Sequence, residues 1–182
     1  MSKLFCLFTA LITLQSFPAR SEILNSGPNG FTVTVALNIS ATPAEVYKHL
    51  VDDIGTWWSS EHSWSGDSHN MSIRAVPMGC FCEKLPGGGV RHMEVVYADP
   101  GKQLTMQGGL GPMLTMAATG NMTIRFSPAT NKATRVEATY AVAGYSPAGM
   151  NTLAAPVDAV LRLQFGRLKN LIENGDASRD HK

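Results

Sequence analysis

The chain has 182 residues, of which 44% are hydrophobic and 16% are charged, and its formal net charge is +1. This length and apolar fraction fit one globular domain with a sizeable core, and they exclude a disulfide-dense miniprotein and a disordered chain. Because 15 basic residues are balanced by 14 acidic ones, the charge also excludes a basic surface that clamps nucleic acid.

Residues 1–21 have the pattern of a secretory signal peptide. A lysine precedes an apolar stretch over residues 4–14, which is too short to span a bilayer. Small residues then precede a cleavage site that we place before Glu22. A buried N-terminal helix is the alternative, but the three-part pattern favours export. We expect an N-terminal extension over residues 22–30, no integral membrane segment in the mature form, and a periplasmic or secreted location.

Two cysteines, Cys80 and Cys82, remain after this cleavage. An oxidising compartment favours disulfides, but side chains two positions apart on a regular strand lie roughly 6–7 Å from each other. A disulfide needs a Cβ separation of about 3.8 Å. Either a bulge distorts the strand, or both cysteines are free thiols that pack as small apolar groups. The regular pattern favours free thiols.

The first half of the mature chain predicts one strand and two short helices. Strict alternation of apolar and polar residues over 31–39 predicts a half-buried strand. The sequence Thr42-Pro43-Ala44-Glu45 is a capping box with proline at the first helical position, which opens a helix through Leu50. A second short helix is expected over 52–58.

The second half predicts a strand meander and a long final helix. Turn signals separate six strands, over residues 71–78, 80–85, 90–98, 103–108, 121–126 and 134–143. Such short connections indicate an antiparallel sheet. Apolar residues at helical spacing predict a helix over about 152–174 that ends at Gly175, and a polar tail follows over 175–182.

Several short motifs occur in a characteristic order along residues 31–174. They are the segment 39–47, the pair Trp57-Trp58, the segment 79–83, the turn Asp99-Pro100-Gly101 and the strand 134–144. In this order the chain resembles the START-like helix-grip superfamily, also called the SRPBCC or polyketide cyclase-like group. The resemblance implies an α+β helix-grip fold, in which a curved antiparallel β-sheet wraps around the long C-terminal helix and encloses a cavity. Members range from lipid carriers to cyclases and co-chaperone domains, so the fold alone assigns no reaction.

Two segments are candidates for lining that cavity. Trp57, Trp58 and Trp64 occur with His62 within eight positions, and such a cluster either seals one end of the core or contacts a ring-bearing or lipid-like ligand. Trp64, outside the adjacent pair, is the stronger candidate for a ligand contact. The glycine-rich apolar segment 107–116 either gates a pocket or is an ordinary hydrophobic connection.

We therefore expect a protein that holds a small hydrophobic or amphipathic ligand between the sheet and the last helix, without a cofactor. Gln164 interrupts the apolar stripe of that helix, and a buried amide needs a polar partner, so it is the expected polar anchor of the ligand. The expected ligand-binding residues are Trp58, His62, Trp64, Met106, Met113, Met116, Tyr140 and Gln164.

An alternative is a cyclase or hydrolase of the same fold that uses His92 with Glu83 or Glu94 as acid–base groups. His92 and Glu94 alternate along one strand, so they are expected on one face, and in a half-solvated meander that face is the wet one. No nucleophile elbow, phosphate-binding loop, dinucleotide fingerprint or His-Glu-x-x-His motif occurs. Burial of His92 would favour the enzyme.

Two further alternatives concern metals and partner proteins. Met78, Cys80 and Cys82 carry soft sulfur ligands suited to Cu(I), but one strand supplies a nearly linear array, so no bound metal is expected. A partner-binding role, as in the co-chaperone-like members, would require a broad exposed apolar patch and no internal cavity. An exported protein would not meet a cytosolic chaperone, and no partner protein is identified.

Overall fold

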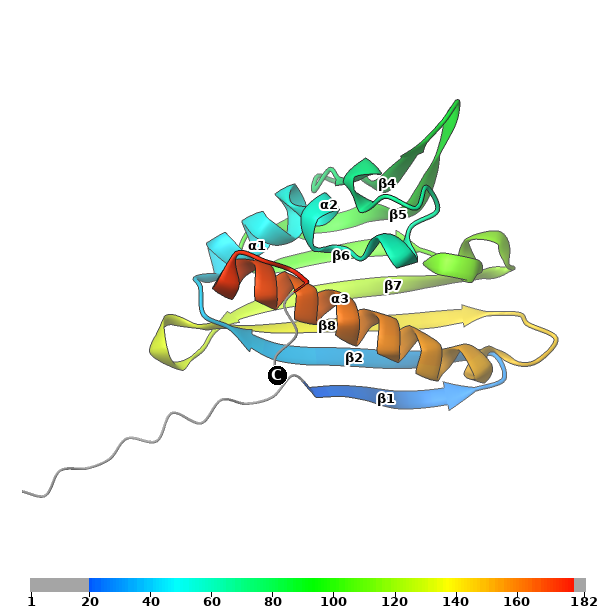
Figure 1. The fold of residues 1–182 in the computed structure, drawn as a ribbon. Helices are drawn as coiled ribbons and strands as arrows, with labels where there is room; N and C mark the ends of the chain where they lie inside the picture. Colours follow the sequence, from blue (N-terminus) through cyan, green and yellow to red (C-terminus); the bar gives the residue numbers. More distant parts are fainter. Residues whose placement is uncertain (1–19, 179–182) are drawn as a thin grey trace, which may run out of the picture.

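The computed structural model describes residues 20–178, which form an eight-stranded antiparallel sheet curved around one long helix (Figure 1). The spatial order of the strands is β1-β2-β8-β7-β6-β5-β4-β3. The strands are β1 (Arg20–Gly27), β2 (Gly30–Ile39), β3 (Met71–Ile73), β4 (Cys80–Leu85), β5 (Gly88–Asp99), β6 (Gln103–Gly108), β7 (Ala118–Pro128) and β8 (Thr134–Gly144). The expected α+β helix-grip fold is confirmed. The strand expected over 71–78 is shorter, because a turn with a positive φ at Met78 replaces its second half.

The segment expected as an N-terminal extension is a strand of the sheet. β1 pairs with β2 in an antiparallel hairpin that closes between Gly27 and Gly30. Six of its eight residues are exposed and none is fully buried, and an edge strand without a buried face imposes no alternating sequence. The proposed cleavage before Glu22 would leave most of this strand on the mature chain. Residues 1–19, which hold the body of the expected signal peptide, lie outside the described residues, and the cleavage stays a prediction.

The first helix begins where its capping box predicts. α1 (Pro43–Asp52) starts after Thr42, whose Oγ1 accepts the Glu45 backbone N–H at 3.4 Å. The Glu45 carboxylate accepts the Thr42 backbone N–H at 2.8 Å and so completes the capping box. A four-residue helix, α2 (Ile54–Trp57), follows directly. Both predicted short helices are confirmed.

The long helix α3 (Ala154–Asn174) lies across one face of the sheet (Figure 1). It begins after a short 3-10 turn, η5 (Met150–Leu153), and ends at Gly175, which has a left-handed φ of 73°. Leu161, Phe165 and Leu168 are buried between the helix and the sheet. Among residues 20–178, no helix is both long and apolar enough to cross a membrane.

A β-bulge in β5 changes which side chains enter the core. Phe81 pairs with Met93 but Cys82 pairs with Arg91, so His92 is an additional residue on β5. Two consecutive side chains, His92 and Met93, are therefore both buried, because a bulge re-aims one side chain out of the regular alternation. The expectation that His92 and Glu94 share the solvent face is wrong.

Cys80 and Cys82 form a disulfide, with their Cα atoms 5.4 Å apart. The expectation of free thiols is wrong because the bulge lies at this point of the β4–β5 pairing, and the geometry of a regular strand does not apply. In the disulfide form the two cysteines offer no thiolate to copper, and Met78 lies on a turn with 80% of its surface exposed. Residues 20–178 contain no cluster of three or more histidine, cysteine, aspartate or glutamate side chains that could hold a metal ion.

Candidate functional site

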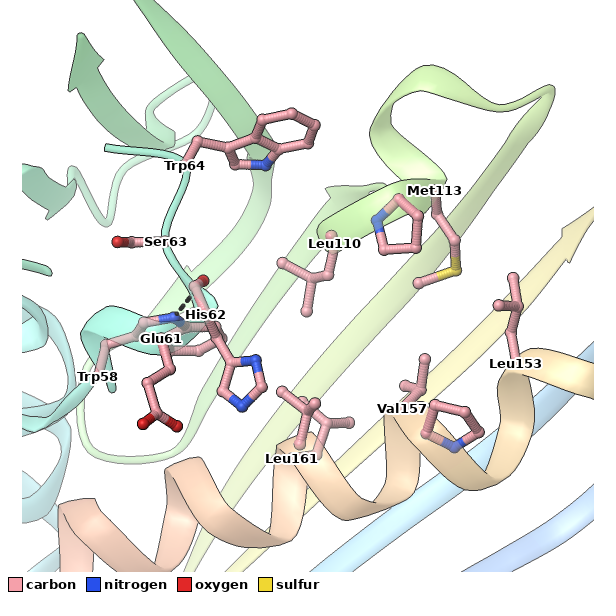
Figure 2. A pocket seen from close by; sticks show the side chains of 14 residues that line it. Trp58, Glu61, His62, Ser63, Trp64, Leu110, Met113, Leu153, Val157 and Leu161 are labelled. Carbon is pink, nitrogen blue, oxygen red and sulfur yellow. Dashed lines mark hydrogen bonds between the residues drawn. The ribbon is translucent and has the colours of Figure 1, made fainter. Parts of the chain in front are cut away.

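A pocket of about 490 Å³ opens between the first half of α3 and two loops (Figure 2). One loop carries the 3-10 turn η1 (Ser60–His62), and the other carries the 3-10 turn η3 (Gly111–Thr115). This volume is in the range of sites that take small organic ligands. The lining residues are Trp58, Glu61, His62, Ser63, Trp64, Leu110, Gly111, Pro112, Met113, Leu153, Pro156, Val157, Val160 and Leu161.

Two of the three walls are apolar. Figure 2 shows Leu110 and Met113 on the η3 loop facing Val157 and Leu161 on α3 across the cavity. Met113 is buried, and its flexible thioether suits an irregular ligand surface. The helix residues have the same spacing as core residues, so sequence alone assigned them to the core stripe. Only the position of the loops leaves them open to the pocket.

The third wall, on the η1 loop, carries the polar groups Glu61, His62 and Ser63. The buried Trp58 fixes this loop, because its indole Nε1–H donates to the His62 carbonyl oxygen at 3.0 Å, the dashed line in Figure 2. Trp64 lies at the open side of the pocket with 48% of its surface exposed. The pocket thus combines apolar walls with one polar, solvent-facing side.

The tryptophan cluster divides between core and pocket. Trp57 donates its indole N–H to the Leu50 carbonyl oxygen at 3.2 Å and packs on Phe165, so it seals the core. Trp58 and Trp64 line the pocket. Both interpretations of the cluster therefore apply, each to different residues.

Glu83 and His92 form a buried pair behind the Trp64 segment. The Glu83 carboxylate accepts the His92 Nε2–H at 3.0 Å and the backbone N–H groups of Trp64 at 3.1 Å and Ser65 at 2.5 Å. Burial disfavours the charge on Glu83, but the hydrogen bonds from Ser65, Trp64 and His92 outweigh it and hold the pKa of Glu83 below its ordinary value. Burial also lowers the pKa of His92, against the opposing influence of Glu83.

The Glu83–His92 pair is consequently an ionised carboxylate that accepts from a neutral imidazole at neutral pH. Two of the hydrogen bonds to Glu83 attach the Trp64 segment to β4, and the third joins Glu83 to His92 on β5. Neither residue lines the pocket. Glu94, the other candidate, lies on the outer face, where its carboxylate accepts from Arg91 at 2.7 Å. The burial of His92 is the condition that favours the enzyme alternative, but the pair does not reach the pocket, and its observed contacts are those of a structural anchor.

Tyr140 anchors the opposite loop from outside the pocket. Its hydroxyl donates to the Gly108 carbonyl oxygen at 3.0 Å and accepts the Leu110 N–H at 3.3 Å. Burial raises the pKa of Tyr140 to about 12, so the hydroxyl keeps its proton and can donate at physiological pH. This contact holds the chain just before η3, where the pocket wall begins.

Gln164 also lies outside the pocket lining. Its side-chain oxygen accepts the buried Ser59 N–H at 2.8 Å, which joins α3 to the chain just before η1. Its Nε2 is buried and has no hydrogen-bond partner among residues 20–178. The structure gives Gln164 a contact within the protein, whereas the polar side of the pocket is formed by Glu61, His62 and Ser63.

Of the eight expected ligand-binding residues, the pocket brings together Trp58, His62, Trp64 and Met113. Met106 lines a much smaller inner void, and Met116 is half-buried against the core. Glu61, Leu110 and the helix residues were missed as site residues. Their only signal in the sequence was proximity to the tryptophan cluster, to the glycine-rich segment and to the start of the last helix.

The sequence matches the family described as polyketide cyclase / dehydrase and lipid transport over residues 30–173. The chain therefore belongs to this family, and the resemblance to the polyketide cyclase-like group is confirmed. No match was found among curated proteins.

Solved structures share the fold. A conserved protein of unknown function from Enterococcus faecalis is similar at 15% identity and a TM-score of 0.60, over 89% of this chain and 82% of that chain. A protein from Mesorhizobium loti is similar at 18% identity and a TM-score of 0.58, over 80% and 98% of the two chains. The Aha1 dimer from Colwellia psychrerythraea is similar at 17% identity and a TM-score of 0.56, over 79% and 97%. At these identities the likeness supports the fold and nothing more.

The contact between Gln164 and Ser59 predicts a stability effect. Gln164→Leu leaves the buried Ser59 N–H unpaired, so it should lower the free energy of unfolding by about 1–3 kcal/mol, measured by urea denaturation. The matched control is Gln107→Leu on the exposed side of β6. This control should change the free energy of unfolding by less than about 0.5 kcal/mol. Unchanged stability in Gln164→Leu, together with weaker ligand binding, would restore Gln164 as a ligand anchor.

The lowered pKa values of Glu83 and His92 predict acid sensitivity. A group whose pKa is lower in the folded state stabilises the fold above its unfolded pKa, and this stability is lost as the pH falls. For His92 the loss begins below its ordinary value of 6.5, and for Glu83 below its ordinary value of 4.5. His92→Gln keeps an N–H donor but does not titrate, so its stability should fall less than that of the wild type between pH 7 and about 5. Urea denaturation at several pH values tests this, and parallel curves would contradict it.

Proposed function

We propose that this protein binds a small hydrophobic or amphipathic organic molecule in the pocket between α3 and the η1 and η3 loops. The observation that carries the proposal is the cavity of about 490 Å³ itself, with apolar walls from α3 and the η3 loop. Burial of an apolar ligand surface against such walls is favourable by roughly 25 cal/mol per Å². The family description, which includes lipid transport, supports the same class of ligand.

The polar side of the pocket favours an amphipathic ligand over a purely apolar one. Glu61 and His62 are both exposed and belong to the η1 loop, opposite the apolar η3 wall. A ligand with an apolar body and one polar end would bury the body against Met113 and Val157 and leave its polar end near His62 and solvent. Apolar walls with a few polar groups are typical of sites that bind small molecules.

We also propose that the protein is exported. The pattern of residues 1–21 supports this, and so does the disulfide between Cys80 and Cys82. Disulfides persist in oxidising compartments and are rare in the reducing cytosol.

Filling the pocket from α3 should weaken ligand binding. Val157 lines the pocket, so Val157→Phe places a larger side chain in the space that a ligand would occupy. We expect the affinity of the Val157→Phe variant for the fluorescent amphiphile anilinonaphthalene sulfonate to fall about tenfold or more. A tenfold loss corresponds to about 1.4 kcal/mol of binding free energy. The measurement is a fluorescence titration, followed by displacement of the probe with laurate.

The matched control is Leu163→Phe, because Leu163 lies on the same helix, is exposed and does not line the pocket. It should bind the probe like the wild type, and thermal unfolding should show that both variants are folded. If Val157→Phe is folded and binds with wild-type affinity, the probe occupies another site and the proposed pocket is wrong.

A further inference from the structure

The Cys80–Cys82 disulfide lies on the outer face of the sheet. Phe81 and Glu83 of β4 are buried, whereas Cys80 and Cys82 alternate with them and are partly exposed. A single residue separates the two cysteines, and disulfides that close the shortest loops restrict the unfolded chain least. The disulfide is thus within reach of small solutes and contributes little entropic stabilisation to the fold.

The residues opposite the two sulfurs make them chemically unequal. Arg91 pairs with Cys82, and Glu94 pairs with Cys80, across the β4–β5 ladder. Side chains directly opposite in an antiparallel pair have Cβ atoms about 4.5–5.5 Å apart. A guanidinium favours a neighbouring thiolate and a carboxylate disfavours one. Although Arg91 and Glu94 also pair with each other at 2.7 Å, Cys82 has the cation as its cross-strand neighbour.

We propose that Cys80–Cys82 is an exchange-active disulfide that reacts with small thiols of the glutathione class. An external thiolate attacks Sγ of Cys80, the bond between the two cysteines breaks, and Cys82 leaves as a thiolate beside Arg91. A second external thiolate then attacks the external sulfur of the mixed disulfide and releases Cys80. Two external thiols are oxidised to one disulfide, and the protein gains two electrons and two protons as a dithiol.

The strand geometry connects this reaction to the interior. Phe81, between the two cysteines, packs edge-on against Trp58 with ring centroids 5.4 Å apart, and lies 4.9 Å from the His92 ring. Trp58 is part of the pocket wall. A relaxation of the backbone at residues 80–82 therefore reaches the indole of Trp58. The tryptophan emission of the protein, to which Trp57 and Trp64 also contribute, is then a readout of the redox state that needs no ligand.

The test equilibrates the folded, purified protein with glutathione buffers of increasing reduced fraction. Acid quenching, alkylation of free thiols and intact-mass spectrometry then count the reduced protein, while far-UV circular dichroism follows the fold. We expect reversible conversion to the dithiol in millimolar reduced glutathione with the fold retained and a change in tryptophan emission. A disulfide that stays closed in excess reduced glutathione, or that opens only when the protein unfolds, overturns the proposal. Failure of the reduced protein to form the disulfide again in oxidised glutathione also overturns the proposal.

A pair of arginine variants tests the role given to Arg91. Arg91→Gln should slow reduction several-fold and shift the alkylation of the dithiol to higher pH, because the Cys82 thiolate loses its neighbouring cation. The matched control is Arg135→Gln, since Arg135 is also an exposed strand arginine beside a carboxylate, Glu137, but lies on β8. Equal rates and alkylation profiles in the wild type and both variants overturn the assignment of Cys82 as the leaving thiolate.

Discussion

The pocket wall that carries Trp64 depends on one buried carboxylate, that of Glu83. Glu83 lies on β4 near the edge of the sheet, and its oxygens accept hydrogen bonds from His92 and from the backbone of Trp64 and Ser65. An ionised carboxylate is costly to bury unless every such contact is made. The segment that carries Trp64 is therefore held against the sheet, and the space between that segment and α3 becomes the pocket.

Two other buried polar side chains fix the remaining walls in the same way. Gln164 joins α3 to the chain before η1 through Ser59, and Tyr140 holds Gly108 and Leu110 at the start of the η3 loop. All three anchoring residues lie outside the pocket lining. Buried polar groups therefore position the loops, and the ligand space itself is bounded mostly by apolar side chains.

The bulge at His92 gives β4 and β5 two different faces with two different chemistries. Toward the interior it places His92 against Glu83 and Phe81. Toward solvent it leaves the disulfide opposite Arg91 and Glu94. One additional residue in a strand thus produces both the anchor behind the pocket and the polar surroundings of an exposed disulfide.

The sequence by itself determined the family, the antiparallel sheet, the capped helix after β2 and the final helix with its glycine cap, because these depend on periodicity and on local capping contacts. It also located two of the three pocket walls, through the tryptophan cluster and the glycine-rich segment. It did not reveal β1, since an exposed edge strand has no alternating pattern, nor the burial of His92, since a bulge reverses alternation without a sequence signal. Only the tertiary structure decided that Val157 and Val160 line a cavity while Phe165 and Leu168 contact the core. Pocket residues and core residues of α3 have the same helical spacing. Which of the two a residue becomes depends on where loops far away in the sequence are held.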